Sequence, residues 1–304
     1  MTQPQTAFLP PTSFLGDKPV RRIGYGAMQL AGPGVFGPPR DPDAARAVLR
    51  RAVQLGVDHI DTSQFYGPDV VNDLIRETLH PYPDELKLVT KVGARRDDRG
   101  GWLPAQSPAE LREGVEDNLR SLRVERMDLV NLRLHSESGT ASEPTAEQLG
   151  AMADLQREGK LDLIGISNAT LDGVKMAVDL LGGLGEVQNA YSILDRSDDP
   201  VVDFCEEHGI AYVAYFPLGS AFAGGPAALA ADQAVAGVAE KHGATPSQIA
   251  LAWLLHRSPR ILLIPGTSSV SHLEENLAAG EIALDEEDLA RLEQVTPVAN
   301  PGGR

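Results

Sequence analysis

The chain alternates short apolar runs with longer segments in which apolar residues recur every three or four positions. Short runs rich in β-branched residues are typical of buried strands, and the longer spacing is typical of helices with one buried face. Strands are predicted over residues 22–28, 57–61, 85–91, 128–133, 161–167, 187–189, 210–215 and 261–264. Helices are predicted over residues 42–56, 70–79, 107–122, 145–158, 171–181, 200–208, 230–242, 246–256, 272–279 and 285–294.

A helix follows each predicted strand, and this regularity decides the predicted fold. It favours a parallel sheet, and eight such units favour a closed (β/α)8 TIM barrel that occupies residues 1–304 as a single domain. Residues 1–20 are expected to form a coil or hairpin, and residues 295–304 a C-terminal tail. An open doubly wound sheet is the alternative. It is less favoured because no early strand leads into G-x-G-x-x-G: the segment GYG at residues 24–26 is followed by Gln29, not glycine.

The composition indicates a soluble, enzyme-like domain and argues against several kinds of partner. Of 304 residues, 42% are hydrophobic, yet no apolar run reaches the ~18 residues that a membrane span needs. The net charge of −16 disfavours nucleic acid and anionic membranes as partners, although it permits a small anionic cofactor. The single cysteine, Cys205, and the lack of a signal-peptide pattern indicate the cytoplasm. No metal-ligand spacing is present, so no metal is predicted, and the oligomeric state stays open with a monomer slightly favoured.

Three chemically distinctive residues fall at or just beyond predicted strand ends. Asp61 ends the second strand, Tyr66 follows it in the loop, and Lys91 ends the third strand. The carboxyl ends of barrel strands face one site, and a lysine buried there needs a charged partner, which Asp61 supplies. An ammonium group beside a phenol favours the ionised phenol, so Tyr66 would donate a proton to a developing alkoxide more readily. Taken alone, Asp61 and Lys91 would be explained more simply as a structural ion pair.

The sequence around these residues resembles the aldo-keto reductase family. The string HIDTSQFYG at residues 59–67 and the string VTKVG at residues 89–93 place Asp, Tyr and Lys in the order of that family. The resemblance spans nearly the whole chain and includes GISN at residues 165–168, which is similar to a G-V-S-N segment of the family. It implies hydride transfer from a nicotinamide cofactor to the carbonyl carbon of a small molecule, with Tyr66 as the proton donor.

The same resemblance implies a set of cofactor-binding residues. Ser167, Asn168 and Gln188 are expected to hold the nicotinamide carboxamide, and Tyr215 to stack on the nicotinamide ring. A loop after the seventh strand is expected to cover the pyrophosphate, and a segment after the eighth strand to bind the adenosine. The further residues expected near the cofactor are Gly26, Met28, Asp61, Phe216, Pro217, Leu218, Ser220, Ile264, Gly266, Thr267, Ser269, His272, Glu275 and Asn276.

One predicted catalytic position departs from the family pattern. Most members carry a histidine at the end of the fourth strand, where this chain has Arg133 in the string DLVNLRLH. His135 is assigned to the loop or to the surroundings of the site. Because arginine does not titrate near neutral pH, Arg133 is expected to orient the carbonyl, to stabilise charge on its oxygen, or to bind an anionic or phenolate-bearing substrate. The string NLR resembles a bacterial subgroup similar to pyridoxal reductases, so pyridoxal is the first substrate expected.

The choice of cofactor is less sharply indicated. Family members that use NADPH generally place Lys or Arg on the adenosine 2′-phosphate, whereas here the nearest cation expected is His272, beside the hydroxyls of Thr267 and Ser269. Family habit predicts NADPH, with NADH as a possible cofactor.

Two rival functions stay open. One is a nucleotide-sensing regulatory protein with little turnover, which the change to Arg133 leaves in play. The other is an isomerase or lyase that uses Lys91 as a Schiff-base amine, against which the cofactor motifs argue.

Overall fold

The strands form one parallel sheet that closes on itself as a barrel. The computed structural model describes residues 12–135, 141–219 and 224–297. The sheet has eight strands in the order β12-β11-β10-β9-β8-β5-β4-β3. Its ends meet because Ile23, just before β3, bridges Leu263 in parallel. The strands are β3 (Tyr25–Gly26), β4 (His59–Asp61), β5 (Lys87–Val92), β8 (Met127–Arg133), β9 (Leu161–Ser167), β10 (Glu186–Ala190), β11 (Ala211–Tyr215) and β12 (Ile261–Leu263).

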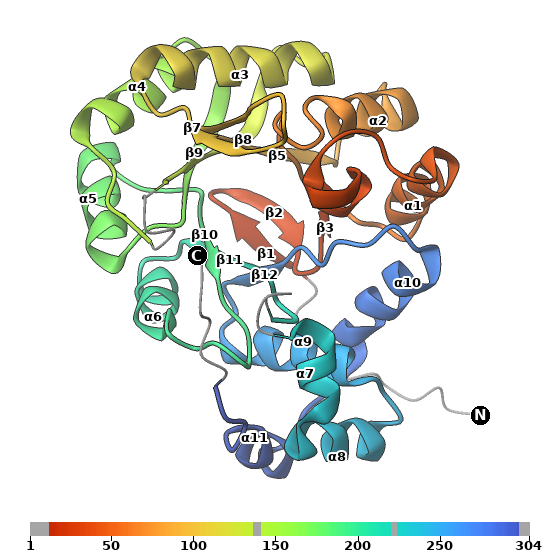
Figure 1. Ribbon diagram of the computed structural model, residues 1–304. Helices are drawn as coiled ribbons and strands as arrows, with labels where there is room; N and C mark the ends of the chain where they lie inside the picture. Colours follow the sequence, from red (N-terminus) through yellow and green to blue (C-terminus); the bar gives the residue numbers. More distant parts are fainter. Residues whose placement is uncertain (1–11, 136–140, 220–223, 298–304) are drawn as a thin grey trace.

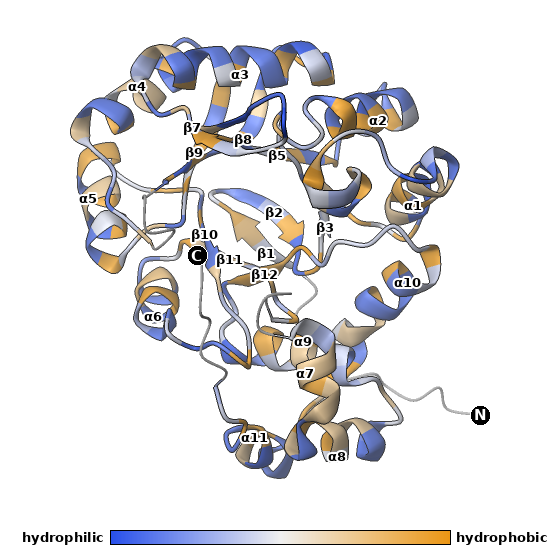
Figure 2. Ribbon diagram, viewed as in Figure 1, coloured by the Kyte–Doolittle hydropathy of each residue, from blue (hydrophilic) through white to orange (hydrophobic). Residues whose placement is uncertain are grey.

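Helices surround the strands, as Figure 1 shows. Most of them bury apolar stripes against the sheet and expose polar faces, so that orange and blue alternate around helices such as those labelled α1, α2 and α3 in Figure 2. None of the helices in the described ranges is long and apolar enough to cross a membrane. The helices are α1 (Pro42–Gln54), α2 (Val70–Leu79), α3 (Pro108–Leu122), α4 (Ala146–Arg157), α5 (Leu171–Leu181), α6 (Asp199–Glu207), α7 (Gly225–Ala231), α8 (Gln233–His242), α9 (Pro246–Arg257), α10 (Val270–Ala278) and α11 (Glu286–Leu292), with short 3-10 turns η1 (Ala27–Leu30), η2 (Pro33–Val35) and η4 (Ala279–Glu281).

A β-hairpin covers the amino end of the barrel. It consists of β1 (Thr12–Leu15) and β2 (Lys18–Arg21), and in Figure 1 it is seen through the ring of helices. The Ser13 hydroxyl donates to the carbonyl of Pro259, before β12, at 3.1 Å. The amide of Gly16 donates to the carbonyl of Gly185, before β10, at 3.2 Å. The hairpin therefore closes one end of the barrel, and the carboxyl ends of the strands face the other.

Three predicted elements differ from the structure. The strand predicted over residues 22–28 is only two residues long, because the chain turns into η1 at Ala27 and carries Met28 out of the sheet. The helix predicted over residues 230–242 is split between α7 and α8, because Asp232 caps the amides of Ala234 and Val235. A second hairpin, β6 (Ala94–Arg96) with β7 (Trp102–Pro104), lies in a stretch that was predicted as loop.

Candidate active site

Asp61 and Lys91 form a buried ion pair at the carboxyl end of the barrel. Asp61 is the last residue of β4, and Lys91 lies near the end of β5; they are 4% and 3% exposed. The Lys91 ammonium donates to Asp61 Oδ1 and, at 3.3 Å, to the carbonyl of Thr62. Burial lowers the pKa of Lys91, but the Asp61 carboxylate and Tyr66 raise it by more, so the net direction is upward. Lys91 is therefore held as a cation.

Tyr66 lies against this pair from the loop between β4 and α2. The Lys91 ammonium nitrogen lies 5.3 Å from the centre of the Tyr66 ring, and a hydrogen bond with Tyr66 helps to raise the pKa of Lys91. The backbone amide of Tyr66 donates to the Ser63 carbonyl at 3.1 Å, and the ring packs edge-to-face on Phe65 at 5.4 Å. Turn and ring packing together hold the tyrosine, which is 4% exposed, beside the ammonium group.

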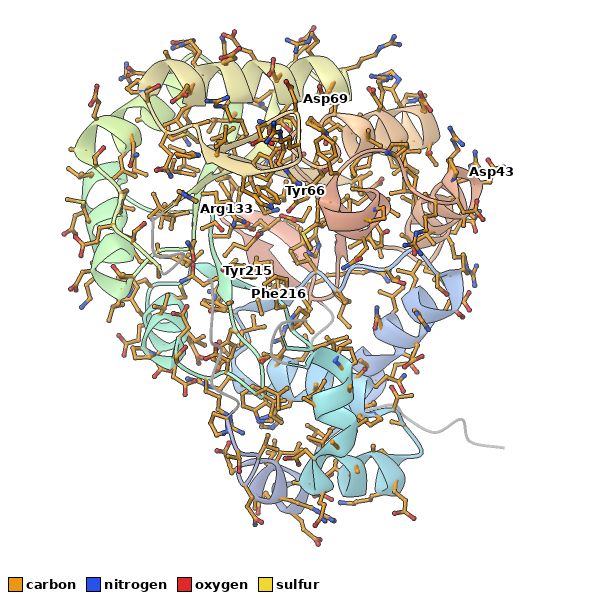
Figure 3. All side chains as sticks on the ribbon, viewed as in Figure 1. Asp43, Tyr66, Asp69, Arg133, Tyr215 and Phe216 are labelled. Atoms are coloured by element: carbon orange, nitrogen blue, oxygen red, sulfur yellow. The ribbon has the colours of Figure 1, made fainter. Side chains whose placement is uncertain are left out.

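Arg133 is the last residue of β8 and is half-buried. Its guanidinium carbon lies 5.6 Å from the centre of the Trp102 ring. Within the part of the chain that the structure describes, no carboxylate or hydrogen-bond acceptor pairs with this guanidinium group. Figure 3 shows Arg133, Tyr66 and Tyr215 around the centre of the barrel, each from a different strand or loop. His135 lies beyond the strand and is exposed, in agreement with its assignment to the loop.

The β6–β7 hairpin adds an aromatic wall beside Arg133 and Tyr66. Trp102 packs edge-to-face on Phe65 at 5.4 Å, and the Arg96 guanidinium carbon lies 4.0 Å from the centre of the Trp102 ring. Arg96 also donates to the carbonyls of Val35, Gly34 and Gly100, so its guanidinium group is used to fix the loops. By sequence alone, Trp102 falls in the loop after the third strand, where a place in the substrate site and surface packing are equally expected, and nothing in the sequence marks Arg96. Only the three-dimensional contacts of Trp102 with Phe65, Arg96 and Arg133 distinguish between a place in the substrate site and surface packing.

The residues expected to hold the nicotinamide lie on neighbouring strands. Gln188 is in register with Ser167, and Asn168 follows Ser167 directly, with φ of 62°. Such a left-handed conformation is uncommon outside glycine, although asparagine adopts it more readily than most residues. Ser167 is 1% exposed, and its hydroxyl has no hydrogen-bond partner among the described residues. A buried hydroxyl without a partner is costly, so Ser167 fits a site for a polar group such as a carboxamide.

The aromatic residue that is expected to stack on the nicotinamide ring lies at the end of β11. Tyr215 ends this strand, is half-buried, and places its hydroxyl 3.4 Å from Asn168 Oδ1. Phe216 comes next with φ of 55°, a strained conformation for a bulky residue, and its ring meets that of Tyr215 edge-to-face at 5.1 Å. Pro217 is buried and Leu218 is half-buried in the loop that follows. The predicted cofactor residue Ser220 lies outside the described residues.

The segment after β12 gathers the residues expected at the adenosine end. Gly26 and Gly266 are both required by close packing: a Cβ on Gly26 would lie 2.4 Å from the Ile264 carbonyl oxygen, and one on Gly266 would lie 2.6 Å from that of Gly26. Tyr25 donates its hydroxyl to the Thr267 carbonyl at 2.6 Å. The first and last strands are thereby locked together under this segment, and Met28 lies half-buried beside them in η1.

The helix α10 begins within the same segment. The Ser269 hydroxyl caps it by accepting from the amide of His272, which is exposed. Glu275 accepts from the Thr245 hydroxyl at 2.7 Å, and Asn276 is 7% exposed. Residues 264–276 contain no lysine or arginine, so His272 is the one side chain of this segment that can carry a positive charge.

Comparison with known proteins places this geometry in a family. Residues 22–297 match the Aldo/keto reductase family. The chain is an aldo-keto reductase. It is 52% identical over 287 residues to pyridoxine 4-dehydrogenase of Escherichia coli K12, covering 94% of this chain and 98% of that protein. It is 36% identical over 280 residues to an uncharacterized oxidoreductase of Schizosaccharomyces pombe, covering 92% of this chain and 88% of that protein.

Solved structures of aldo-keto reductases share the fold. One from Klebsiella pneumoniae, in complex with NADPH, superposes with a TM-score of 0.76 at 24% identity and covers 97% of this chain and 99% of that chain. The predicted family and the predicted (β/α)8 barrel are thus confirmed. As a member of the family, this aldo-keto reductase is an oxidoreductase that reduces carbonyl groups of small molecules with NADP(H).

Proposed function

We propose that this aldo-keto reductase interconverts pyridoxal and the corresponding alcohol, with NADPH as the hydride donor and Tyr66 as the proton donor. The observation that carries the proposal is the contact of Tyr66 with the buried Asp61–Lys91 pair. The substrate is suggested by the 52% identity to a pyridoxine 4-dehydrogenase and by the half-buried Arg133. The site draws on several strands of one barrel, which supports the proposal that residues 1–304 act as a single domain.

The proposed proton transfer follows from the charges around Tyr66. When bound, the nicotinamide supplies a hydride to the carbonyl carbon, and negative charge develops on the carbonyl oxygen. Tyr66 donates its phenolic proton to that oxygen, and the ammonium group of Lys91 stabilises the tyrosinate that remains. Asp61 keeps Lys91 charged and in place. A cationic Lys91 is a poor nucleophile, which argues against the Schiff-base alternative.

Arg133 supplies the proposed recognition of the substrate. Pyridoxal carries a phenolic hydroxyl on the ring carbon next to its aldehyde-bearing carbon, and this hydroxyl ionises readily. A guanidinium group presents several fixed donors and binds such an oxygen together with the neighbouring carbonyl. Trp102, beside Arg133, offers an indole face to an aromatic ring. The same donors stabilise charge on the carbonyl oxygen, where most of the family use a histidine.

The proposed cofactor site fits a nicotinamide at Ser167, Asn168, Gln188 and Tyr215, with the phosphates towards β11 and β12. NADPH follows from family membership. Because residues 264–276 offer only His272 as a cation for the 2′-phosphate, we propose that selectivity over NADH is weaker than is usual in the family. Titration of the protein with both cofactors tests this: tighter binding of NADH would overturn the choice of NADPH.

The proposal is tested by the absorbance of the reduced nicotinamide during reaction with a panel of aldehydes that includes pyridoxal. Turnover of pyridoxal is expected in the unaltered protein. Tyr66→Phe is expected to lower kcat by about a hundredfold or more, because it removes the proton donor, while the affinity for NADPH stays nearly unchanged. Retained turnover in Tyr66→Phe would remove Tyr66 from this role. Tight NADPH binding without turnover of any aldehyde would favour the rival regulatory function.

A further inference from the structure

A fully buried carboxyl group lies next to the site, and the proposed chemistry does not use it. Glu186 is the first residue of β10 and is 1% exposed. Its Oε1 accepts from Asn131 Nδ2 at 2.6 Å and from Gln188 Nε2 at 3.2 Å. Gln188 Nε2 also donates to Asp61 Oδ2 at 3.0 Å. With the pair of Asp61 and Lys91, these contacts form one hydrogen-bonded chain from Lys91 to Asn131.

Asn131 reaches Glu186 across an intervening strand because that strand has a glycine at the crossing. Asn131 on β8 and Glu186 on β10 are both in register with Gly165 on β9. A Cβ at position 165 would lie 2.2 Å from Asn131 Oδ1 and 3.0 Å from Glu186 Cγ. Three strands therefore have to supply asparagine, glycine and glutamate at one level of the barrel for this contact to form.

The buried cluster holds two carboxyl groups and one ammonium group. Asp61 on β4 and Lys91 on β5 are the charged groups that face Glu186, while its partner on β8 is neutral Asn131 and the paired positions on β9 and β11 are glycine and alanine. Burial is the main cause that raises the pKa of Glu186, to about 7, and the hydrogen bond from Asn131 opposes it. A carboxyl group kept in such a place costs folding free energy, so its presence calls for a functional reason.

We propose that Glu186 is a positioning residue that fixes the amide of Gln188, with the nitrogen towards the two carboxyl groups and the carbonyl oxygen left for the nicotinamide carboxamide beside Ser167. The amide nitrogen has two hydrogens to donate, and Asp61 and Glu186 accept both. Rotating the amide by half a turn would place its oxygen against two carboxyl groups. The inference rests on the proposed function, because it concerns the binding of a nicotinamide at this site.

A double-mutant cycle tests the proposal with the dissociation constant of NADPH, measured at pH 8 by quenching of tryptophan fluorescence, without any turnover. Gln188→Ala is expected to raise the constant about tenfold, the effect of about one hydrogen bond. Glu186→Met is expected to raise it about fivefold in the otherwise unaltered protein, but less than about twofold in the Gln188→Ala background, because Glu186 acts through Gln188. Glu186→Gln keeps a carbonyl acceptor and is expected to stay within about threefold of the unaltered protein.

Asp288→Asn serves as the control. Asp288 is another buried carboxylate, 2% exposed, but it bonds to Lys241 and His242 at the contact of α8 and α11. Its loss should lower the melting temperature and leave the NADPH constant unchanged. Should Glu186→Met not fold, the pH dependence decides instead. Protonation makes the carboxyl group neutral, like the amide of Glu186→Gln, so the affinity of the unaltered protein should fall by about two- to threefold between pH 8 and pH 6. Glu186→Gln should lack this contribution to the pH dependence.

The results that would overturn this inference differ from the result that would overturn the proposed function. Additive effects of Glu186→Met and Gln188→Ala, an unchanged NADPH constant in a folded Glu186→Met, or the same pH response in Glu186→Gln and the unaltered protein would each overturn this inference alone. Failure of the unaltered protein to bind NADPH would overturn the proposed function as well.

Discussion

Arg133 places a fixed positive charge where the pattern of the family has histidine. A histidine at this position can exchange a proton near neutral pH, whereas a guanidinium group cannot. Its half-buried guanidinium group lies beside Trp102 and pairs with no carboxylate in the described parts of the chain. Charge without a partner in such a place is best matched by a ligand that brings a negative or strongly polar oxygen.

Replacement of Arg133 by leucine should therefore discriminate between substrates. For pyridoxal, kcat/KM is expected to fall about a hundredfold, because a hydrogen-bonded charge pair of about 2–3 kcal/mol is lost. For pyridine-4-carboxaldehyde, which lacks the phenolic hydroxyl, the fall should stay below about tenfold. Both values come from the loss of reduced-nicotinamide absorbance. An equal loss for the two aldehydes would mean that Arg133 acts on the carbonyl that they share and not on the phenolate.

At the scale of the element, strand β9 contributes through the side chain of Ser167 and through the missing side chain of Gly165. Its last residue is Ser167, whose buried hydroxyl faces the expected carboxamide site. Its Gly165 leaves the space in which Asn131 meets Glu186. One strand thus lines both the proposed cofactor site and the buried cluster beside it. A change at the glycine should therefore disturb the packing of the two neighbouring strands.

Gly165→Ala is expected to lower the free energy of unfolding by about 1–3 kcal/mol, because the added methyl group overlaps Asn131 and the sheet leaves it no room. Urea denaturation followed by circular dichroism measures this change. Gly150→Ala is the matched control: Gly150 lies within α4 and has no atom within 4 Å of an added Cβ. It should stabilise the protein by about 0.5–1 kcal/mol, the usual gain from alanine in a helix. Similar effects at both positions would contradict the packing account.

The β6–β7 hairpin is an element whose importance comes from contacts distant in sequence. Arg96 binds carbonyls of the loop after β3 and of its own hairpin, and stacks on Trp102. Trp102 in turn meets Phe65, the neighbour of Tyr66. The hairpin therefore connects the loops after the first, second and third strands of the barrel beside the proposed substrate site, and its aromatic contacts support the loop that carries Tyr66.

At the scale of the whole molecule, the buried Glu186 links folding stability to pH. Its pKa is raised to about 7 in the folded protein from the ordinary value of 4.5. The folded state thus binds more protons than the unfolded state between these values, and its stability falls as the pH rises through this window. Asp288 has a pKa lowered to about 2, so its contribution is lost only as the pH falls below about 4 and does not overlap.

Urea denaturation between pH 4.5 and pH 8 should reveal this dependence. The raised pKa of Glu186 corresponds to at most about 3 kcal/mol of unfolding free energy lost across the window. Glu186→Gln has no ionisable group there, so its stability should change by clearly less over the same range. Equal pH profiles for the two proteins would show that Glu186 does not titrate in this window.

Much of the barrel follows from local pattern. The alternation of strands and helices, the caps at Asp41 and Ser107, and the helix ends required little tertiary information, since each depends on near neighbours in the chain. Prediction was wrong where packing overrides pattern. The run from Arg22 to Met28 looks like one strand, but the close approach of Gly26 to Ile264 ends it early.

The candidate site divides in the same way. Asp61, Tyr66 and Lys91 were predicted because strand ends meet at one end of a barrel, so their order along the chain suffices to bring them together. Glu186 and Arg96 gave no such signal. A glutamate at a strand start and an arginine in a loop are ordinarily exposed, and nothing near them in sequence indicates a partner.

The sequence by itself determined the barrel, the family and the meeting of Asp61, Tyr66 and Lys91, because the burial pattern and the order of the strands depend on residues near one another in the chain. The tertiary structure alone decided that Glu186 reaches Asn131 over Gly165 and shares Gln188 with Asp61. These contacts join four different strands of the sheet, β4, β8, β9 and β10. Which side chains meet there depends on the stagger of the strands and on the volume of the residue between them, and neither is a property of any one stretch of sequence.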